Sequence, residues 1–466
     1  MRRLAVGLLS RVFAPAWGEV IRLREYERVA LDNGVVRLLA EKHDVPLVGL
    51  RAVVRGGAAA DPAERAGMAG LVSTLMQKGA GDRDAAAFAG AAANVGGRIS
   101  ASTSAEAVSV SADFLARDAG LMIELVADML MRPTLSEDEF LKERDRTIAL
   151  IQASKGSGVR SLMSSYANAF MFGDHPYGNP PSGSESSLAT ISHDELTQFY
   201  QDRFGGDRLI VAVVGDFNLE PMKAALTRAF GEWAPAAAPL PIPPAPAPIE
   251  GRRVLLVDKP GSAQTYFWIG NVGVALDYPR RAELRIANTL FGGRFSSMLM
   301  TALRVETGLT YGARSTVEQF SRPGTVTIRS YTETSKTVEA IDLAIELLGR
   351  LHRRGVDDEM ITSARNYIMG QYPPTLETAA ALAAMLAFLE QHGLGRDYID
   401  AYGDALSAAT PVSVHNTISE VYPLPDNLVL VLIGDAELIR EDVAKYGPVT
   451  EMSITEPRFR PDQLSK

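Results

Sequence analysis

The histidines of this chain of 466 residues offer little of the usual catalytic chemistry. No two histidines have the spacing of a metal-binding pair, and cysteine is absent, which excludes disulfides, thiolate metal sites and cysteine nucleophiles. The sequence also lacks a nucleophile elbow, a phosphate-binding loop and a dinucleotide fingerprint. The six histidines are His43, His175, His193, His352, His392 and His415. An unrelated enzyme with a site of its own is therefore the weakest interpretation.

The segment Gly67–Gly79 has a pattern that needs an explanation. Its apolar residues recur at helical spacing and predict a helix with one buried face; they are Met68, Leu71, Val72, Leu75 and Met76. Gly70 falls in the middle of this helix, where glycine costs about 1 kcal/mol relative to alanine. One explanation is an ordinary core helix. The other is a helix that once carried functional side chains, with Gly70 as a vacated position.

The glycine frame of this segment resembles the zinc helix of the pitrilysin and mitochondrial processing peptidase family, which reads roughly G-x-x-H-x-x-E-H-x-x-x-x-G. Aligned on Gly67 and Gly79, the positions of the first histidine, the glutamate base, the second histidine and the later glutamate ligand hold Gly70, Ser73, Thr74 and Leu150. A catalytic zinc needs imidazole, carboxylate or thiolate donors and a carboxylate base. The resemblance therefore implies that this chain binds no metal and no other cofactor.

A second signature of the same family is intact. The segment Leu303–Ala313 resembles the family's arginine and tyrosine pair, with Arg304 and Tyr311 seven residues apart on a turn from helix to strand. In the family this pair reaches the zinc site, binds the substrate backbone and stabilises the oxyanion of the tetrahedral intermediate, where fixed donors lower the barrier. The plainer alternative is a surface arginine and a half-buried tyrosine at the start of a strand.

Bulk composition limits the class of protein. Hydrophobic residues make up 46% and charged residues 22% of the chain, as in folded, soluble proteins without a membrane span. The net charge of -9 and the pI near 5.4 argue against nucleic acid as a partner. Residues 1–24 are predicted to be a leader or a signal segment, because two arginines precede a short apolar run that stops at Ser10. A cytoplasmic and a periplasmic location both stay open.

Residues 235–250 contain seven prolines and predict a stiff, extended linker between two domains. The sequences on either side repeat one another. An apolar run ending at Gly215-Asp216 recurs at Gly434-Asp435, 219 residues later, and the pair Arg65-Ala66 recurs at Arg281-Ala282, an offset of 216. Landmarks at nearly equal offsets predict a duplicated domain of about 220 residues.

The order of predicted elements indicates the fold class. A hairpin is expected at residues 29–36, where Asn33-Gly34 is a turn signal, and strands are expected at 47–55, 99–104 and 107–114, before helices from about 118 to 204. Strands and helices in runs favour an α+β fold with a mostly antiparallel sheet backed by helices in each domain. The resemblance adds a half-clamshell shape. The expected domains are 25–234, with the zinc motif lost, and 251–466, with the arginine and tyrosine pair.

The resemblance implies a division of labour. The leading hypothesis is the non-zinc subunit of a bacterial heterodimeric zinc metallopeptidase that degrades peptides, in which a zinc-bearing homologous subunit is the partner. The chain would be inactive alone, while Arg304 and Tyr311 would complete the partner's site in trans. The alternative is a catalytically silent scaffold or peptide-binding subunit of the same fold.

Overall fold

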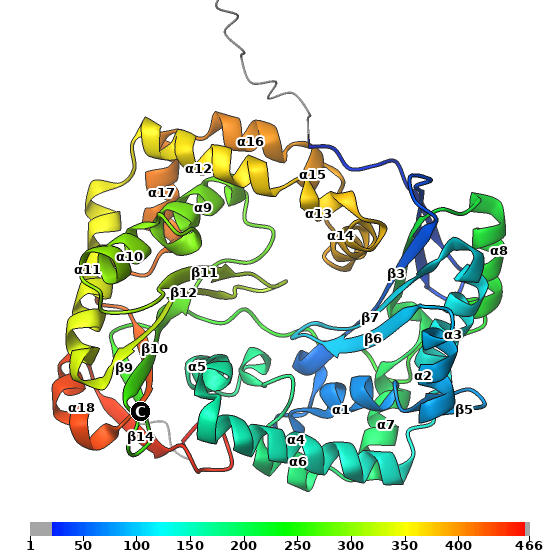
Figure 1. Cartoon of the computed structure of the whole chain (residues 1–466), viewed down its shortest axis with the longest axis horizontal. Coiled ribbons are helices and arrows are strands. Elements are labelled where there is room, and N and C mark those ends of the chain that lie inside the picture. The colour runs from blue at the N-terminus through cyan, green and yellow to red at the C-terminus, as the bar shows by residue number, and fades with distance from the viewer. Residues whose placement is uncertain (1–20, 462–466) are drawn as a thin grey trace, which may run out of the picture.

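The computed structural model describes residues 21–461, which form two lobes, residues 21–234 and 251–461, each built on a six-stranded sheet with helices packed against it (Figure 1). The two sheets lie toward opposite ends of the long axis of the molecule (Figure 1). The predicted α+β class is confirmed, with two sheets backed by helices in a half-clamshell. Residues 1–20 of the predicted leader lie outside the described residues. Ile21 and Leu23 of the same predicted segment are buried, with the Leu23 N–H donating to Asp400 at 2.6 Å.

The sheet of the first lobe is mostly antiparallel. Only β2 (Val36–Glu41) and β8 (Leu209–Gly215) run parallel to one another. The β1–β2 hairpin closes at the pair Ala30 and Val36, with Gly34 at φ +93°, a conformation that favours glycine. In spatial order the strands are β1 (Glu27–Ala30), β2 (Val36–Glu41), β8 (Leu209–Gly215), β3 (Leu47–Arg55), β7 (Ala107–Leu115) and β6 (Arg98–Thr103). The predicted hairpin and strands are therefore present, with small shifts at their ends.

The sheet of the second lobe repeats this topology. In spatial order its strands are β11 (Arg314–Glu318), β12 (Thr325–Glu333), β10 (Gln264–Val272), β13 (Val429–Gly434), β9 (Arg253–Asp258) and β14 (Val449–Ser453). Read from β11 to β9, the order and directions match those from β6 to β2. The last strand differs: β14 is parallel to β9, whereas β1 is antiparallel to β2. The shared strand order and directions agree with the predicted duplication.

Helices cover both sheets, and several begin at capping residues that the sequence supplies. Ser192 accepts from the Glu195 N–H and Glu195 bonds back to the Ser192 N–H, which fixes the start of α7. The first lobe contains α1 (Met68–Leu75), α2 (Ala85–Ala93), α3 (Ala119–Met131), α4 (Glu137–Ser157), α5 (Met163–Phe172), α6 (Glu185–Thr190), α7 (His193–Arg203) and α8 (Leu219–Phe230). The second contains α9 (Arg281–Asn288), α10 (Met298–Met300), α11 (Thr337–Arg354), α12 (Asp358–Gln371), α13 (Pro374–Glu377), α14 (Ala379–Gln391), α15 (Asp397–Asp400), α16 (Tyr402–Ala408), α17 (Pro411–Val421) and α18 (Ala436–Val443).

Each lobe contributes a helix that covers part of the other lobe's sheet. Helix α14 of the second lobe packs on β3 and β8 of the first, and Leu386 joins Leu38 and Ile210 in one apolar cluster. Gly49 on β3 permits this approach, since a Cβ there would lie 2.7 Å from the Ala380 nitrogen. Helix α5 of the first lobe contacts β10 and β13 of the second. Strands covered on both faces are expected to be continuous apolar runs, and β8 and β13 are buried throughout.

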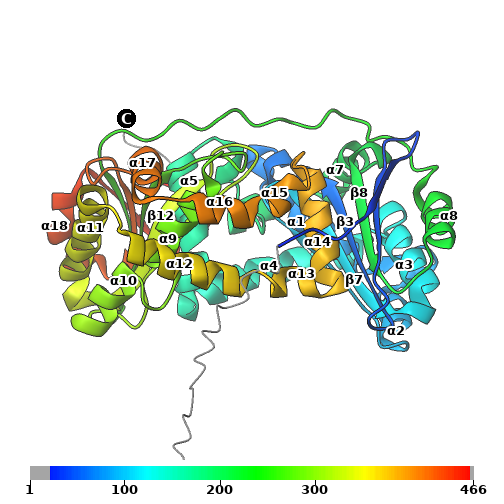
Figure 2. The same cartoon turned by 90° about the horizontal axis from the view of Figure 1, so that it is seen from above.

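The proline-rich segment 235–250 contains neither helix nor strand. In Figure 2 it runs along one side of the molecule from the first lobe to the second. Its carbonyl groups are bound to both lobes, for example Pro244 by His175 Nε2 at 2.9 Å and Pro243 by Arg322 Nε at 3.1 Å. The segment is therefore an ordered strap.

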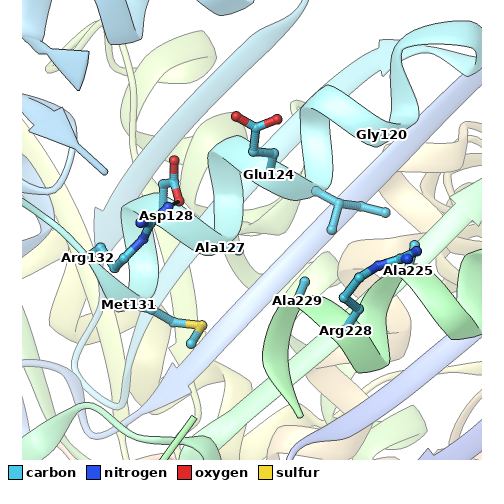
Figure 3. Close-up of a pocket in the computed structure, with 10 residues that line it drawn as sticks. Gly120, Glu124, Ala127, Asp128, Met131, Arg132, Ala225, Arg228 and Ala229 are labelled. Carbon is cyan, nitrogen blue, oxygen red and sulfur yellow. Dashed lines mark hydrogen bonds and ion pairs between the residues drawn. The ribbon is translucent and has the colours of Figure 1, made fainter. Parts of the chain in front are cut away.

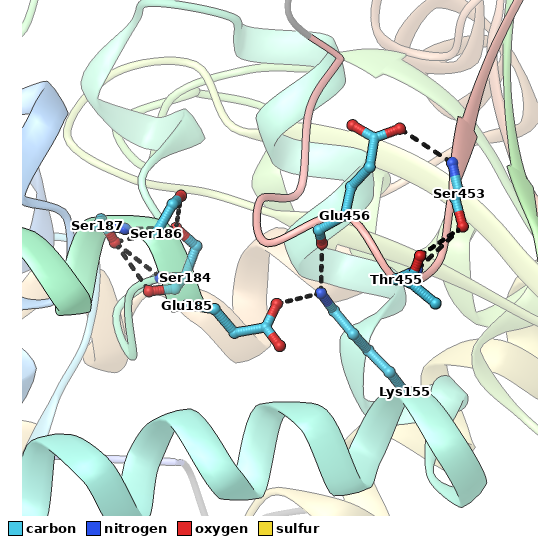
Figure 4. Close-up of polar contacts among 8 residues, drawn as sticks. All are labelled: Lys155, Ser184, Glu185, Ser186, Ser187, Ser453, Thr455 and Glu456. Carbon is cyan, nitrogen blue, oxygen red and sulfur yellow. Dashed lines mark hydrogen bonds and ion pairs between the residues drawn. The ribbon is translucent and has the colours of Figure 1, made fainter.

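The chain after β14 returns from the second lobe to the first (Figure 4). Lys155 on α4 is buried, pairs with Glu185 and donates to the carbonyl of Glu456. Phe459 is buried and meets the Tyr166 ring edge-on at 4.9 Å between centroids. We call residues 454–461 the tail; it forms a second connection between the lobes.

Candidate functional site

Helix α1, at the position of the zinc helix in the resembled family, is a packed core helix. Asp61 holds its start, accepting from the Gly67 N–H at 2.7 Å and the Ala69 N–H at 3.0 Å. Burial raises the pKa of the Asp61 carboxyl to about 7, and the N–H donors of the helix oppose that rise. Leu71 and Leu75 are buried on the core face. The apolar spacing therefore marks a face that packs in the core, as predicted.

Gly70 is not an empty position. A Cβ at residue 70 would lie 2.3 Å from the Pro181 carbonyl oxygen, closer than any normal contact. The loop around Pro181 fills the space that a histidine side chain would need, so residue 70 has no room for a metal ligand in this structure. The hydroxyl groups of Ser73 and Thr74 both donate to the Gly70 carbonyl, at 2.9 and 3.1 Å.

The fourth position of the motif frame is also unsuited to a metal. Leu150 lies on α4 with 57% of its surface exposed. The buried carboxylate on this helix, Glu143, is paired with Lys78 at 2.7 Å. Among residues 21–461 there is no group of three or more His, Cys, Asp or Glu side chains that could hold a metal ion. The residues of this chain at the motif positions do not fit zinc.

Arg304 and Tyr311 lie next to one another in the second lobe. Arg304 is on the π-helical turn η8 (Thr301–Glu306), a conformation often found at functional sites, and Tyr311 is in the loop before β11. The Arg304 guanidinium carbon is 4.2 Å from the centre of the Tyr311 ring and 5.0 Å from that of Phe295. Tyr311 is 73% exposed. Among the described residues Arg304 has neither an ion pair nor a hydrogen-bond acceptor, so its N–H groups are free to bind a ligand.

The strand β12 fixes the loop that carries Tyr311. The Thr332 hydroxyl donates to the Leu309 carbonyl at 2.7 Å, and the Ser330 hydroxyl donates to the Gly312 carbonyl at 3.0 Å. Gly308 turns the chain at φ +65°, and the side chain of Leu309 is buried. A mostly exposed tyrosine is thereby attached to a rigid sheet, the arrangement that precise positioning of a donor requires.

The pair borders a cavity of about 890 Å³. Its walls come from α9, the π-helical turn η7 (Thr289–Gly293), η8 and β10–β12 of the second lobe, and from residues 160–164 of the first. None of Gly70, Ser73, Thr74 and Leu150 lines it. The structure therefore brings Arg304 and Tyr311 together, apart from the four motif positions.

Sequence reasoning missed several residues of this cavity. Phe295 is one of them, although the segment around it has a signal in Gly292, whose Cβ would lie 2.2 Å from the Ser315 nitrogen. That close approach holds the turn bearing Phe295 against β11. Arg160 and Arg329 also line the cavity, and they come from distant segments that no local pattern connects.

A second cavity, of about 500 Å³, lies between α3 and α8 on the first lobe (Figure 3). Its floor is apolar, with Ala127, Met131 and Ala229. Asp128 at its edge is paired with Arg83 at 3.1 Å and with Arg132. No residue singled out in the sequence lines it.

Two family models match the chain. The model described as "Insulinase (Peptidase family M16)" matches residues 37–183, and the one described as "Peptidase M16 inactive domain" matches residues 190–368. The chain belongs to the M16 family of peptidases. The predicted family resemblance is thereby confirmed. No helix among residues 21–461 of this M16 protein has the length and apolarity needed to cross a membrane.

Individual M16 relatives agree with this assignment. The chain is 25% identical over 357 residues to an uncharacterized zinc protease of Bacillus subtilis, covering 76% of this chain and 85% of that one. It is 21% identical over 385 residues to a Helicobacter pylori protein named a non-peptidase homologue, covering 82% and 87%. The crystal structure of an M16 inactive domain from Pseudomonas fluorescens has a TM-score of 0.82 at 20% identity, covers 88% of this chain and 98% of that chain, and supports the fold.

Proposed function

We propose that this chain is the non-zinc subunit of a heterodimeric zinc metallopeptidase that degrades peptides. The observation that carries the proposal is the contrast between two sites in one chain. The donors of Arg304 and Tyr311 are free and face a cavity, whereas the four motif positions leave no place for a metal. A homologous partner would supply the zinc ion, which activates water for attack on a peptide bond.

The role of Arg304 and Tyr311 is to bind the substrate carbonyl oxygen. The guanidinium and the phenol both donate hydrogen bonds, and the negative charge that this oxygen gains in the tetrahedral intermediate makes those bonds stronger. Packing against Phe295 and Tyr311 restricts the Arg304 side chain before substrate binds. Such donors stabilise the transition state more than the ground state, which is the condition for catalysis.

The test is reconstitution. The purified chain is expected to bind no stoichiometric zinc and to cleave no peptide, while addition of a zinc-bearing M16 homologue from the same cell yields peptidase activity. Arg304→Ala and Tyr311→Phe are each expected to lower kcat of the complex by about 10²–10³-fold, the usual loss for an oxyanion donor. Arg354→Ala, at the exposed end of α11, is the matched control and should leave kcat unchanged.

Two results contradict the proposal. Efficient hydrolysis by the isolated chain would mean that it carries a complete site. An unchanged kcat in both variants, with complex formation intact by gel filtration, would support the alternative of a silent scaffold or peptide-binding subunit. The name of the Helicobacter pylori relative, a non-peptidase homologue, favours keeping that alternative.

A further inference from the structure

The cavity beside Arg304 and Tyr311 is strongly cationic. Six arginines line it and no aspartate or glutamate does, although the chain as a whole has a net charge of -9. The arginines are Arg160, Arg285, Arg294, Arg304, Arg314 and Arg329. A concave wall with charges of one sign concentrates the electrostatic potential inside it and attracts ligands of the opposite sign.

The described residues place no carboxylate at ion-pair distance from these guanidinium groups. None of the six forms an ion pair with a residue in the range 21–461, whereas Arg396 and Arg440 elsewhere each bind carboxylates. The Nε atoms of Arg294 and Arg329 are buried without a hydrogen-bond partner. Burial lowers the pKa of Arg329. The negative charge of Glu318, which lies beyond ion-pair distance, opposes this lowering. An anion in the cavity would bind the accessible N–H groups of these arginines, and such charge-assisted hydrogen bonds are strong.

Exposed aromatic rings accompany the positive charge. Phe295, Tyr311 and Tyr367 are 64%, 73% and 42% exposed, and all three line the cavity. Tyr266 and Tyr331 stack inside it with ring centroids 5.5 Å apart. Aromatic rings beside arginines provide apolar area and hydrogen-bonding edges together, a composition typical of sites that bind peptides and proteins.

We infer that this cavity binds an acidic segment of a peptide, with aspartate or glutamate carboxylates on the arginines and the peptide's apolar groups on the exposed rings. Its volume of about 890 Å³ is within the range of ligand pockets and suits a few residues. Arg304 belongs to both the cavity and the proposed catalytic pair. A peptide held here therefore extends toward the bond to be cleaved, and the site selects substrates with acidic residues near that bond.

A peptide fits the surroundings of the cavity better than a nucleic acid does. Nucleic-acid sites are usually basic surfaces that follow a phosphate backbone over many contacts. Here six arginines line one cavity of a protein whose net charge is -9. The preference for acidic substrates rests on the proposed function, but the binding step requires this chain alone.

The test measures binding to the full chain without a partner subunit. Three fluorescein-labelled peptides of equal length carry glutamate, glutamine or lysine at the same positions, and a single-stranded oligonucleotide is the fourth probe. By fluorescence anisotropy the glutamate peptide is expected to bind at least about tenfold more tightly than the others. Added salt should weaken this binding, because screening acts on charge pairs. Equal binding of the glutamine peptide, or tighter binding of the oligonucleotide, overturns the inference.

Variants locate the binding site. Arg160→Gln combined with Arg314→Gln changes two exposed arginines of the cavity, and the Kd for the glutamate peptide is expected to rise at least about tenfold. Arg354→Gln, outside the cavity, is the matched control and should leave the Kd unchanged. An unchanged Kd in the double variant overturns the inference even if the peptide binds. Because no catalysis is measured, this failure is distinct from failure of reconstituted hydrolysis.

Discussion

Gly70 has no side chain to bind a metal, and it is one of four motif positions without a donor suited to zinc. The Pro181 carbonyl occupies the place of a side chain, so substitution at this position alters packing before it can alter chemistry. Arg304 has the opposite character. Its guanidinium is packed between rings, yet its hydrogen-bonding capacity is unused among the described residues. The two residues explain why activity is expected only in a complex.

The first prediction concerns Gly70. Gly70→Ala is expected to lower the free energy of unfolding by about 1–3 kcal/mol, the cost of overpacking, because its methyl group meets a backbone oxygen. Gly90→Ala in α2 is the matched control. A Cβ at residue 90 meets no atom within 4 Å, so this change should stabilise the protein by about 0.5–1 kcal/mol. Urea unfolding measures both, and equal shifts in the two variants would show that residue 70 has room.

The second prediction concerns pH. Burial lowers the pKa of His352 below its ordinary value of 6.5, and a weaker rise comes from its hydrogen bond to the Pro423 carbonyl at 3.1 Å. Below pH 6.5 the unfolded chain therefore binds a proton that the folded chain does not. The contribution of His352 to stability is complete above pH 6.5 and falls as pH decreases.

The measurement is urea unfolding of wild type and His352→Gln between pH 7.5 and 5. Wild type is expected to lose stability faster than the variant as pH falls, by at most about 1.4 kcal/mol per pH unit for one proton. Parallel pH profiles of the two proteins would contradict the shift. The difference between the profiles removes the contributions of all other titrating groups.

At the scale of elements, the stability of the first sheet is expected to depend on the packing of α14 against it. Leu386 is 1% exposed in a cluster that includes strands of the other lobe. Leu386→Ala is expected to cost about 2–5 kcal/mol, because it leaves a cavity in a packed interface. Hydrogen exchange should become faster at β3 and β8 as well as in α14. Leu438→Ala, at a residue 64% exposed on α18, is the control, and exchange changes confined to the second lobe would argue against this coupling.

The sequence predicted elements better than their contacts. Continuous apolar runs and the Asn33-Gly34 turn were sufficient for strands and the hairpin, since these signals are local. The packing of α5 and α14 on the sheet of the other lobe could not be predicted, because an apolar helix face does not specify which sheet it covers. Arg304 and Tyr311 were found because their segment resembles a motif of the family, whereas Phe295 and Arg329 belong to no such motif. The catalytic role of Arg304 and Tyr311 stays a prediction.

At the scale of the whole molecule, three features connect the lobes. They are the strap, the helices α5 and α14, which each pack on the sheet of the other lobe, and the tail. Phe459 is 3% exposed and lies against Tyr166 of the first lobe. Phe459→Ala is expected to lower the free energy of unfolding by about 3–5 kcal/mol, as for other buried phenylalanines. Leu424→Ala, at a residue 53% exposed, is the control. If both variants unfold at the same urea concentration, the tail contributes little to stability.

The exchange of α14 also has a consequence for synthesis. The strand of the first sheet that is made last, β8, ends at Gly215, but helix α14, which packs on β3 and β8, begins only at Ala379. At about 5–20 residues per second, a ribosome needs roughly 8–33 s to make the intervening chain. During that time the apolar face of the first sheet that α14 later covers is exposed, because α14 has not yet been synthesised. We expect chaperones that shield apolar surfaces to bind the chain mainly in this interval.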